Sequence, residues 1–119
     1  KDCQAHTSHG AHLAGVNEEK INDLLKYQES SHYIDSVKAV LDLAFASGKT
    51  PNQANQEHFD NLLKYFNDEQ IIDMVAVISL FGFLNRWNDT NGTALEEKPL
   101  EFAQEMLSSS GWSHGKHGF

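Results

Sequence analysis

Apolar residues recur along this chain every three to four positions, which is the period of an amphipathic α-helix. Three segments show such a stripe clearly, namely residues 17–25, 34–47 and 59–66. Alternation with a period of two, which is the pattern of a half-buried strand, is not found in the sequence. The pattern therefore predicts an all-α protein, a helical bundle of about five to six helices.

Turn and capping residues mark where the predicted helices begin and end. A small-residue segment over residues 2–14 stops at Gly15, and Asn17 is suited to start the next helix. Asn67, followed three residues later by Gln70, forms a capping-box pattern. Each of these signals is local, and together they set the predicted helix boundaries.

The segment from Ile71 to Trp87 is apolar on nearly every side of the expected helix. A helix of this kind lies at the centre of a domain or in a subunit interface. Gly82 within it predicts the close approach of a neighbouring backbone. The apolar run to Leu84 is interrupted by Asp73 and is too short to span a bilayer, so we expect no membrane partner.

A short helix over residues 99–107 completes the bundle, which gives one predicted domain over residues 1–110. The remaining residues, 111–119, carry three glycines and predict a C-terminal tail. We expect this tail to be mobile, or to clamp a neighbouring subunit through Trp112 and Phe119.

Charge and cysteine content narrow the classes of function. Nine Lys and Arg residues against 17 Asp and Glu residues give a formal net charge of −8, dispersed along the 119 residues. An acidic surface repels phosphate backbones, which argues against a nucleic-acid partner. A single cysteine excludes an internal disulfide and fits a reducing compartment, so we expect a cytoplasmic protein.

That cysteine, Cys3, is followed by histidines at every third position: His6, His9 and His12. An imidazole one helical turn from a thiol can take or share its proton, and the first turn of a helix favours the thiolate, which is the nucleophilic form. Cys3 and His6 are therefore the candidate catalytic residues, with His9 as a possible accessory. The alternative from residue types alone is that Cys3 is an inert small hydrophobe.

The same histidines do not predict a metal centre. Each residue of a helix advances about 100°, so Cys3 and His12 lie on opposite sides of it. One helix cannot bring all four side chains to one ion, although two of them completed by another helix or subunit would suit zinc. We expect no metal and no cofactor, and solvated positions for His9 and His12.

Arg86 is a second accessory candidate, because it emerges from the apolar helix and needs a carboxylate partner or an anionic ligand. We interpret it as a tie between helices or subunits. Three aspartates on neighbouring predicted helices could face it: Asp35, Asp42 and Asp73. Glu96 and Glu97, by contrast, look like ordinary surface charge.

Two segments together resemble a known family. The run Cys3-Gln-Ala-His6-Thr, with Ala11-His-Leu-Ala-Gly15, resembles the redox-motif segment of the carboxymuconolactone decarboxylase superfamily, in its alkylhydroperoxidase D-like, peroxidase-related branch. Residues 75–90 are similar to the long central helix of the same proteins. The resemblance extends to about residue 102 and covers what would be the C-terminal two-thirds of such a protein.

The resemblance implies an all-helical bundle that assembles as a homo-oligomer, a trimer or a hexamer. It also implies thiol redox chemistry, in which a C-x-x-C pair reduces a peroxide or a disulfide substrate with help from a histidine and an upstream glutamate. Cys3 matches the second cysteine of the pair and His6 the assisting histidine. The protein would thus be a thiol-dependent peroxidase or disulfide oxidoreductase, with an antioxidant role.

This chain departs from the family pattern in three ways. The first cysteine would fall immediately before Lys1, and the segment that would carry the glutamate is not in the sequence. The assisting histidine of the best-known members comes four residues after the cysteine, where this chain has Thr7.

Two alternative functions stay open. One is a cofactor-free lactone decarboxylase with His6 or His9 as its acid–base group, and the other is a non-catalytic helical assembly domain.

Overall fold

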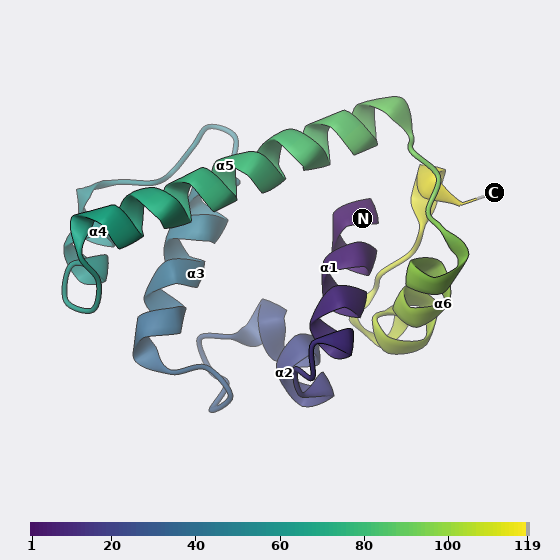
Figure 1. Cartoon of the computed structure of the whole chain (residues 1–119), viewed down its shortest axis with the longest axis horizontal. Coiled ribbons are helices and arrows are strands. Elements are labelled where there is room, and N and C mark those ends of the chain that lie inside the picture. Colours follow the sequence, from purple (N-terminus) through teal and green to yellow (C-terminus); the bar gives the residue numbers. More distant parts are fainter. Residues whose placement is uncertain (119) are drawn as a thin grey trace. The chain divides into compact units, whose positions relative to one another are not determined.

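The computed structural model describes residues 1–118 (Figure 1), and the ordered elements among them are helices. The α-helices are α1 (Asp2–Leu13), α2 (Glu18–Asn22), α3 (Asp35–Ser47), α4 (Gln56–Leu62), α5 (Asp68–Asn91) and α6 (Glu97–Met106). Three short 3₁₀ helices accompany them: η1 (Asp23–Lys26), η2 (Ser108–Ser110) and η3 (Gly115–His117). No strand occurs in residues 1–118, and the predicted all-α class is confirmed.

The helix boundaries follow the capping residues of the sequence. Gly15 adopts a positive φ of 85° just after α1, a conformation that glycine reaches without strain. The Asn17 side chain accepts a hydrogen bond of 2.7 Å from the backbone N–H of Glu19 at the start of α2. At the start of α5, Asn67 and Gln70 each bond the other's backbone N–H, at 2.9 and 3.0 Å.

The chain divides into two compact units, and the predicted domain over residues 1–110 stays a prediction. One unit combines residues 1–25 with the chain from Phe83 onward, and the other comprises Lys26–Gly82. Helix α5 contributes residues to both. The first unit therefore joins the N-terminal helix to the C-terminal part of the chain.

Residues 111–118 of the predicted C-terminal tail make contacts within the first unit, and the mobility of the tail stays a prediction. Trp112 packs against the core of the first unit, and its indole N–H donates to the Lys1 carbonyl at 3.3 Å. His117 is almost fully buried. Its two ring nitrogens lie 2.8 Å from the Thr93 carbonyl and 2.9 Å from the Asp89 carboxylate. The predicted clamp through Phe119 lies outside the described residues.

The core of the first unit is small and is built around alanines. Ala5 of α1 and Ala103 of α6 are fully buried, as is Leu95, and the largely buried Leu107 packs with them. Side chains this short let α1 and α6 approach closely, which brings the first turns of the two helices near one another. The positions of the polar groups near Cys3 depend on this packing.

The core of the second unit follows the predicted apolar stripes. Ala39 and Leu43 of α3, Leu62 of α4 and Ile71 of α5 are buried together. Helix α4 ends at Leu62, so the stripe predicted to continue to residue 66 runs past the end of the helix.

Helix α5 is the element whose burial differs most from expectation, since Ile71 is its one buried residue among those described. Its large apolar side chains are exposed: Ile72, Val75, Val77, Leu80, Phe81, Phe83 and Trp87. Nothing lies within 4 Å of the place where a side chain at Gly82 would begin, so the expected close approach is not made within the described chain.

The length of α5 also corrects the expectation that this segment is too short to cross a membrane. Its 24 residues rise about 36 Å, against about 30 Å for the hydrocarbon core of a bilayer. By length and composition alone α5 could cross a membrane, and one such helix is weak support for a membrane protein. Near its start, α5 contributes Ile71 to the buried core of the second unit. Near its end, it contributes Asn88, whose side-chain amide bonds Asp2 in the first unit.

The adjacent leucines at the end of α4 test this description of the second unit. Leu62→Ala should lower the free energy of unfolding by about 2–5 kcal/mol, because it leaves a cavity in a closed core. Leu63→Ala is the matched control: its side chain is 50% exposed, so its effect should stay below about 1 kcal/mol. Urea denaturation followed by circular dichroism measures both, and equal losses would contradict the assigned core.

Candidate functional site

Cys3 lies in the first turn of α1, where its thiol is free and half-buried. The polar side-chain atom in contact with the sulfur is Nδ2 of Asn88, at 4.0 Å from Sγ. The Thr7 hydroxyl donates to the Cys3 carbonyl at 2.6 Å, a bond within the helix that does not involve the thiol. Helix α1 thus presents the cysteine, and the end of α5 provides its polar neighbour.

The residue before the cysteine, Asp2, carries a buried carboxylate. It is 4% exposed, and its Oδ1 accepts a hydrogen bond of 3.0 Å from Nδ2 of Asn88. The second oxygen, Oδ2, is buried and has no hydrogen-bond partner among the described residues. A buried carboxylate is costly unless it is paired and hydrogen-bonded, so Asp2 depends on the few groups that face Oδ1.

His6 is one of those groups, and it links Asp2 to Glu96. Its Nδ1 lies 3.1 Å from the Asp2 carbonyl and 3.4 Å from Asp2 Oδ1, while Nε2 lies 2.5 Å from Oε2 of Glu96. Both ring nitrogens therefore face acceptors. Two N–H donors exist together only in the imidazolium, so this geometry favours the charged ring.

The pKa shifts of His6 and Glu96 agree with that geometry. Burial opposes the charge on His6, but the hydrogen bond that its ring donates to Glu96, together with the backbone carbonyl and carboxylate of Asp2, outweighs burial and raises the pKa of His6 above 6.5. The pKa of Glu96 falls below 4.5, first because its own backbone N–H bonds the carboxylate and then because His6 does. Both shifts favour an ion pair near neutral pH.

These contacts change how the predicted site is understood. Cys3 and His6 share one helix as expected, yet neither ring nitrogen of His6 is within hydrogen-bonding distance of the thiol in the described structure. The role of His6 as a proton partner of Cys3 therefore stays a prediction. The interpretation of Glu96 as ordinary surface charge is wrong, because it is the N-cap residue of α6 and bonds His6.

Sequence reasoning also missed Asp2 and Asn88. Asp2 is an acidic residue in the first turn of α1, where acidic residues are common because they interact favourably with the helix dipole. Its position alone therefore does not indicate a buried, hydrogen-bonded carboxylate. Asn88 lies 86 residues further along the chain, and nothing local indicates that its amide meets Asp2.

The two remaining histidines of α1 pack around one aromatic ring. His9 and His12 lie 5.3 and 5.0 Å from Phe102 of α6, measured between ring centroids. His12 is exposed as expected, with Nδ1 at 3.5 Å from Oε1 of Glu18, whereas His9 is half-buried. An accessory role for His9 stays a prediction, and its observed contact is a packing contact.

Arg86 does not make the tie to another helix that we expected within this chain. It is exposed, and no hydrogen bond or ion pair joins it to any residue in 1–118. Asp42, one of its three expected partners, is instead bonded by Tyr27 and Gln28 within the second unit. The tie to another subunit stays a prediction.

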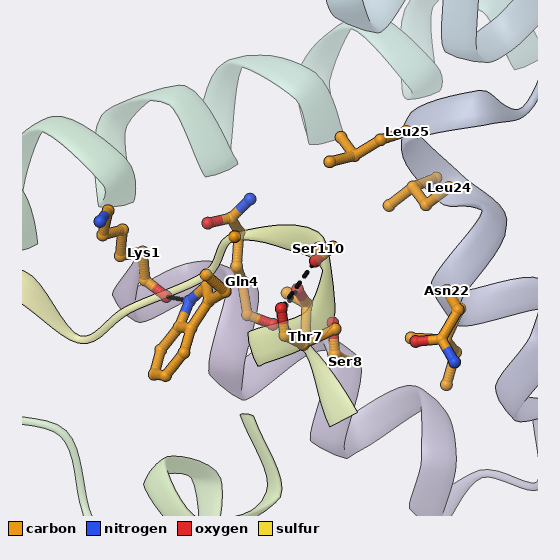
Figure 2. A pocket seen from close by; sticks show the side chains of 12 residues that line it. Lys1, Gln4, Thr7, Ser8, Asn22, Leu24, Leu25 and Ser110 are labelled. Carbon is orange, nitrogen blue, oxygen red and sulfur yellow. Dashed lines mark hydrogen bonds between the residues drawn. The ribbon is translucent and has the colours of Figure 1, made fainter. Parts of the chain in front are cut away.

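No group of three or more His, Cys, Asp and Glu side chains in residues 1–118 is arranged to hold a metal ion. A cleft of about 170 Å³ opens on the flank of α1 that carries Gln4, Thr7 and Ser8 (Figure 2). Its apolar lining includes Ile21, Leu24, Leu25 and Trp112. Cys3 is next to this flank in sequence but does not line the cleft.

No protein-family model matches the chain, and no curated protein matches it. Two solved structures do, both of the debrominase Bmp8: the apo protein, and a cysteine-to-alanine variant in complex with 2,3,4-tribromopyrrole. Each is 35% identical to this chain, with TM-scores of 0.80 and 0.81 respectively. Each match covers 88% of this chain and 56% of the solved chain, so the chain spans a little over half the length of those proteins.

The pair of His6 and Glu96 predicts how stability depends on pH. The contribution from His6, whose pKa is raised, is complete below 6.5 and is lost as pH rises through the raised value. The contribution from Glu96, whose pKa is lowered, is complete above 4.5 and is lost as pH falls through the lowered value. Stabilisation by the ion pair of His6 and Glu96 is therefore largest between pH 4.5 and pH 6.5.

Glu96→Gln should remove this pH dependence in part. The side chains of His6 and Glu96 are 39% and 72% exposed. The loss in free energy of unfolding near pH 6 should therefore stay under about 1 kcal/mol, and it should shrink at alkaline pH. Glu97→Gln is the matched control, since Glu97 is exposed and also lies at the start of α6. Denaturation curves measured across this pH range decide the matter, and identical curves for the two variants would contradict the ion pair.

Proposed function

We propose that this chain belongs to a thiol-dependent oxidoreductase of the alkylhydroperoxidase D-like branch of the carboxymuconolactone decarboxylase superfamily, with Cys3 as its nucleophile. The observation that carries the proposal is a free, half-buried cysteine in a first helical turn, next to the polar cluster of Asp2, His6 and Asn88. The fold is that of Bmp8, whose cysteine-to-alanine variant was solved with a brominated pyrrole.

With a hydroperoxide as substrate, the Cys3 thiolate attacks the terminal oxygen and the O–O bond breaks. The cysteine becomes a sulfenic acid, and the remainder takes up a proton from solvent and leaves as an alcohol. A second thiol then attacks the sulfur, forming a disulfide and releasing water. Two thiols are consumed for each peroxide, so the whole protein needs a resolving cysteine or an external thiol, and an external dithiol regenerates both.

A second substrate class is favoured by the likeness to Bmp8. A thiolate can attack the bromine of a brominated pyrrole, so that the C–Br bond breaks, its electron pair returns to the ring carbon and a proton takes the place of the bromine. The resulting S–Br bond is then broken by the second thiol, which gives a disulfide and bromide. The electron balance equals that of peroxide reduction, and the same two thiols serve both reactions.

We further propose that the protein is a homo-oligomer, a trimer or hexamer, acting in the cytoplasm. The exposed apolar side chains of α5 support an interface, because exposed apolar patches on a protein surface are typical of contacts between chains. The unpaired position of Arg86 among the described residues supports a tie to a carboxylate of another subunit. A single cysteine in the sequence fits a reducing compartment.

Turnover by the full-length protein tests the proposal directly. With a dithiol reductant present, we expect consumption of hydrogen peroxide or release of bromide from 2,3,4-tribromopyrrole, and Cys3→Ser should reduce either rate by about 100-fold or more. His12→Gln is the control, because His12 is an exposed residue of the same helix and should leave the rate unchanged.

The alternatives give different results in the same assay. Activity that persists in Cys3→Ser would contradict the proposed role of the thiol. Lactone decarboxylation that survives thiol alkylation would support the lyase alternative, with His6 or His9 as its acid–base group. Absence of all three activities, with slow alkylation of Cys3, would support a non-catalytic assembly domain.

A further inference from the structure

We infer that Asn88 is a positioning residue for Cys3, which donates one amide hydrogen to the cysteine thiolate while Asp2 holds the other. The inference rests on the proposed function, since it concerns the thiol that performs the chemistry. Its basis is that a single nitrogen, Nδ2 of Asn88, lies 3.0 Å from Oδ1 of Asp2 and 4.0 Å from Sγ of Cys3.

The orientation of the Asn88 amide follows from its partner. An ionised carboxylate only accepts hydrogen bonds, so the nitrogen of the amide, and not its oxygen, must face Asp2. That nitrogen carries two hydrogens, and the bond to Asp2 uses one of them. The second is left for the sulfur, which is the other polar atom within reach of Nδ2.

The buried position of Asp2 makes this arrangement rigid. Its carboxylate is 4% exposed, its Oδ2 has no partner among the described residues, and Oδ1 is bonded by Asn88 and faced by His6. Rotating the amide away would leave the carboxylate with His6 as its one remaining donor. Asp2 thus holds the amide in the orientation that serves Cys3.

The charges around the thiol explain why a neutral donor is useful there. Asp2 and His6 flank Cys3 in the sequence of α1 and contact each other at 3.4 Å, and Glu96 at the start of α6 bonds His6. Asp89 of α5 is bonded to His117. When the S–H bond breaks and the proton passes to solvent, the new negative charge forms one residue away from the buried Asp2 carboxylate and is repelled by it. A hydrogen bond from Asn88 to the thiolate offsets that repulsion.

The pH profile of alkylation tests the inference without any substrate. Full-length protein is treated with iodoacetamide across the neutral and alkaline range, and the peptide that contains Cys3 is quantified by mass spectrometry. Asn88→Ala should shift the midpoint of the profile upward by about one pH unit, which makes alkylation near pH 7 about tenfold slower. Asn88→Asp should shift it further, because it adds a negative charge.

Asn91→Ala is the matched control. Asn91 is an exposed asparagine of the same helix, and its amide donates to the Trp87 carbonyl at 2.8 Å, so its removal should leave the midpoint unchanged. Asp2→Asn should move the midpoint the opposite way, to lower pH, because it removes a negative charge beside the thiol. General structural damage would not produce shifts of opposite sign.

A folded Asn88→Ala variant with the midpoint of the wild type would overturn the inference. If removal of Asn88 prevents folding by leaving Asp2 unpaired, the same substitution is compared in the Asp2→Asn background, where no buried carboxylate remains. The midpoint of the double variant should then exceed that of Asp2→Asn alone, and equal midpoints would overturn the inference. A shifted midpoint without peroxide or bromopyrrole turnover would count against the proposed function and not against the role of Asn88.

Discussion

The first unit depends on one buried carboxylate. Asp2 lies at the start of α1, and a carboxylate removed from water must find donors or positive charge. Asn88 of α5 provides an amide, and His6 provides a ring that Glu96 holds from the start of α6. Satisfying that single group therefore brings the beginnings of α1 and α6 and the end of α5 to one place.

The first turns of α1 carry both a core residue, Ala5, and the polar residues Cys3 and His6. Ala5 and Ala103 are small enough for α1 and α6 to approach closely, which lets His6 reach Glu96 across the contact. Cys3 follows Asp2 directly, so fixing the carboxylate also fixes the backbone that carries the thiol. The apolar residues of the first unit thus create the geometry, and its polar residues set the charge around the sulfur.

How much the sequence could predict depended on how local each signal was. The caps at Asn17 and Asn67 and the stop at Gly15 act within a few residues, and the structure confirms them. The bond between His6 and Glu96 joins residues 90 positions apart, so no spacing rule can indicate it, and the sequence around Glu96 indicates only surface charge. The all-round apolar character of α5 is evident from its sequence, but the exposure of its side chains depends on contacts with distant residues that the sequence pattern does not specify.

His6 is a charged link between two carboxylates, and it holds the turn that bears Cys3. Nitrogen NMR of histidine-labelled protein measures this directly, because the ring nitrogens report both protonation and tautomer. The pKa of His6 should lie above 6.5, with N–H groups at both ring nitrogens below that pKa, and the side-chain amide signals of Asn88 should shift as His6 titrates. A neutral His6 that titrates below 6.5 without affecting Asn88 would contradict this charged link.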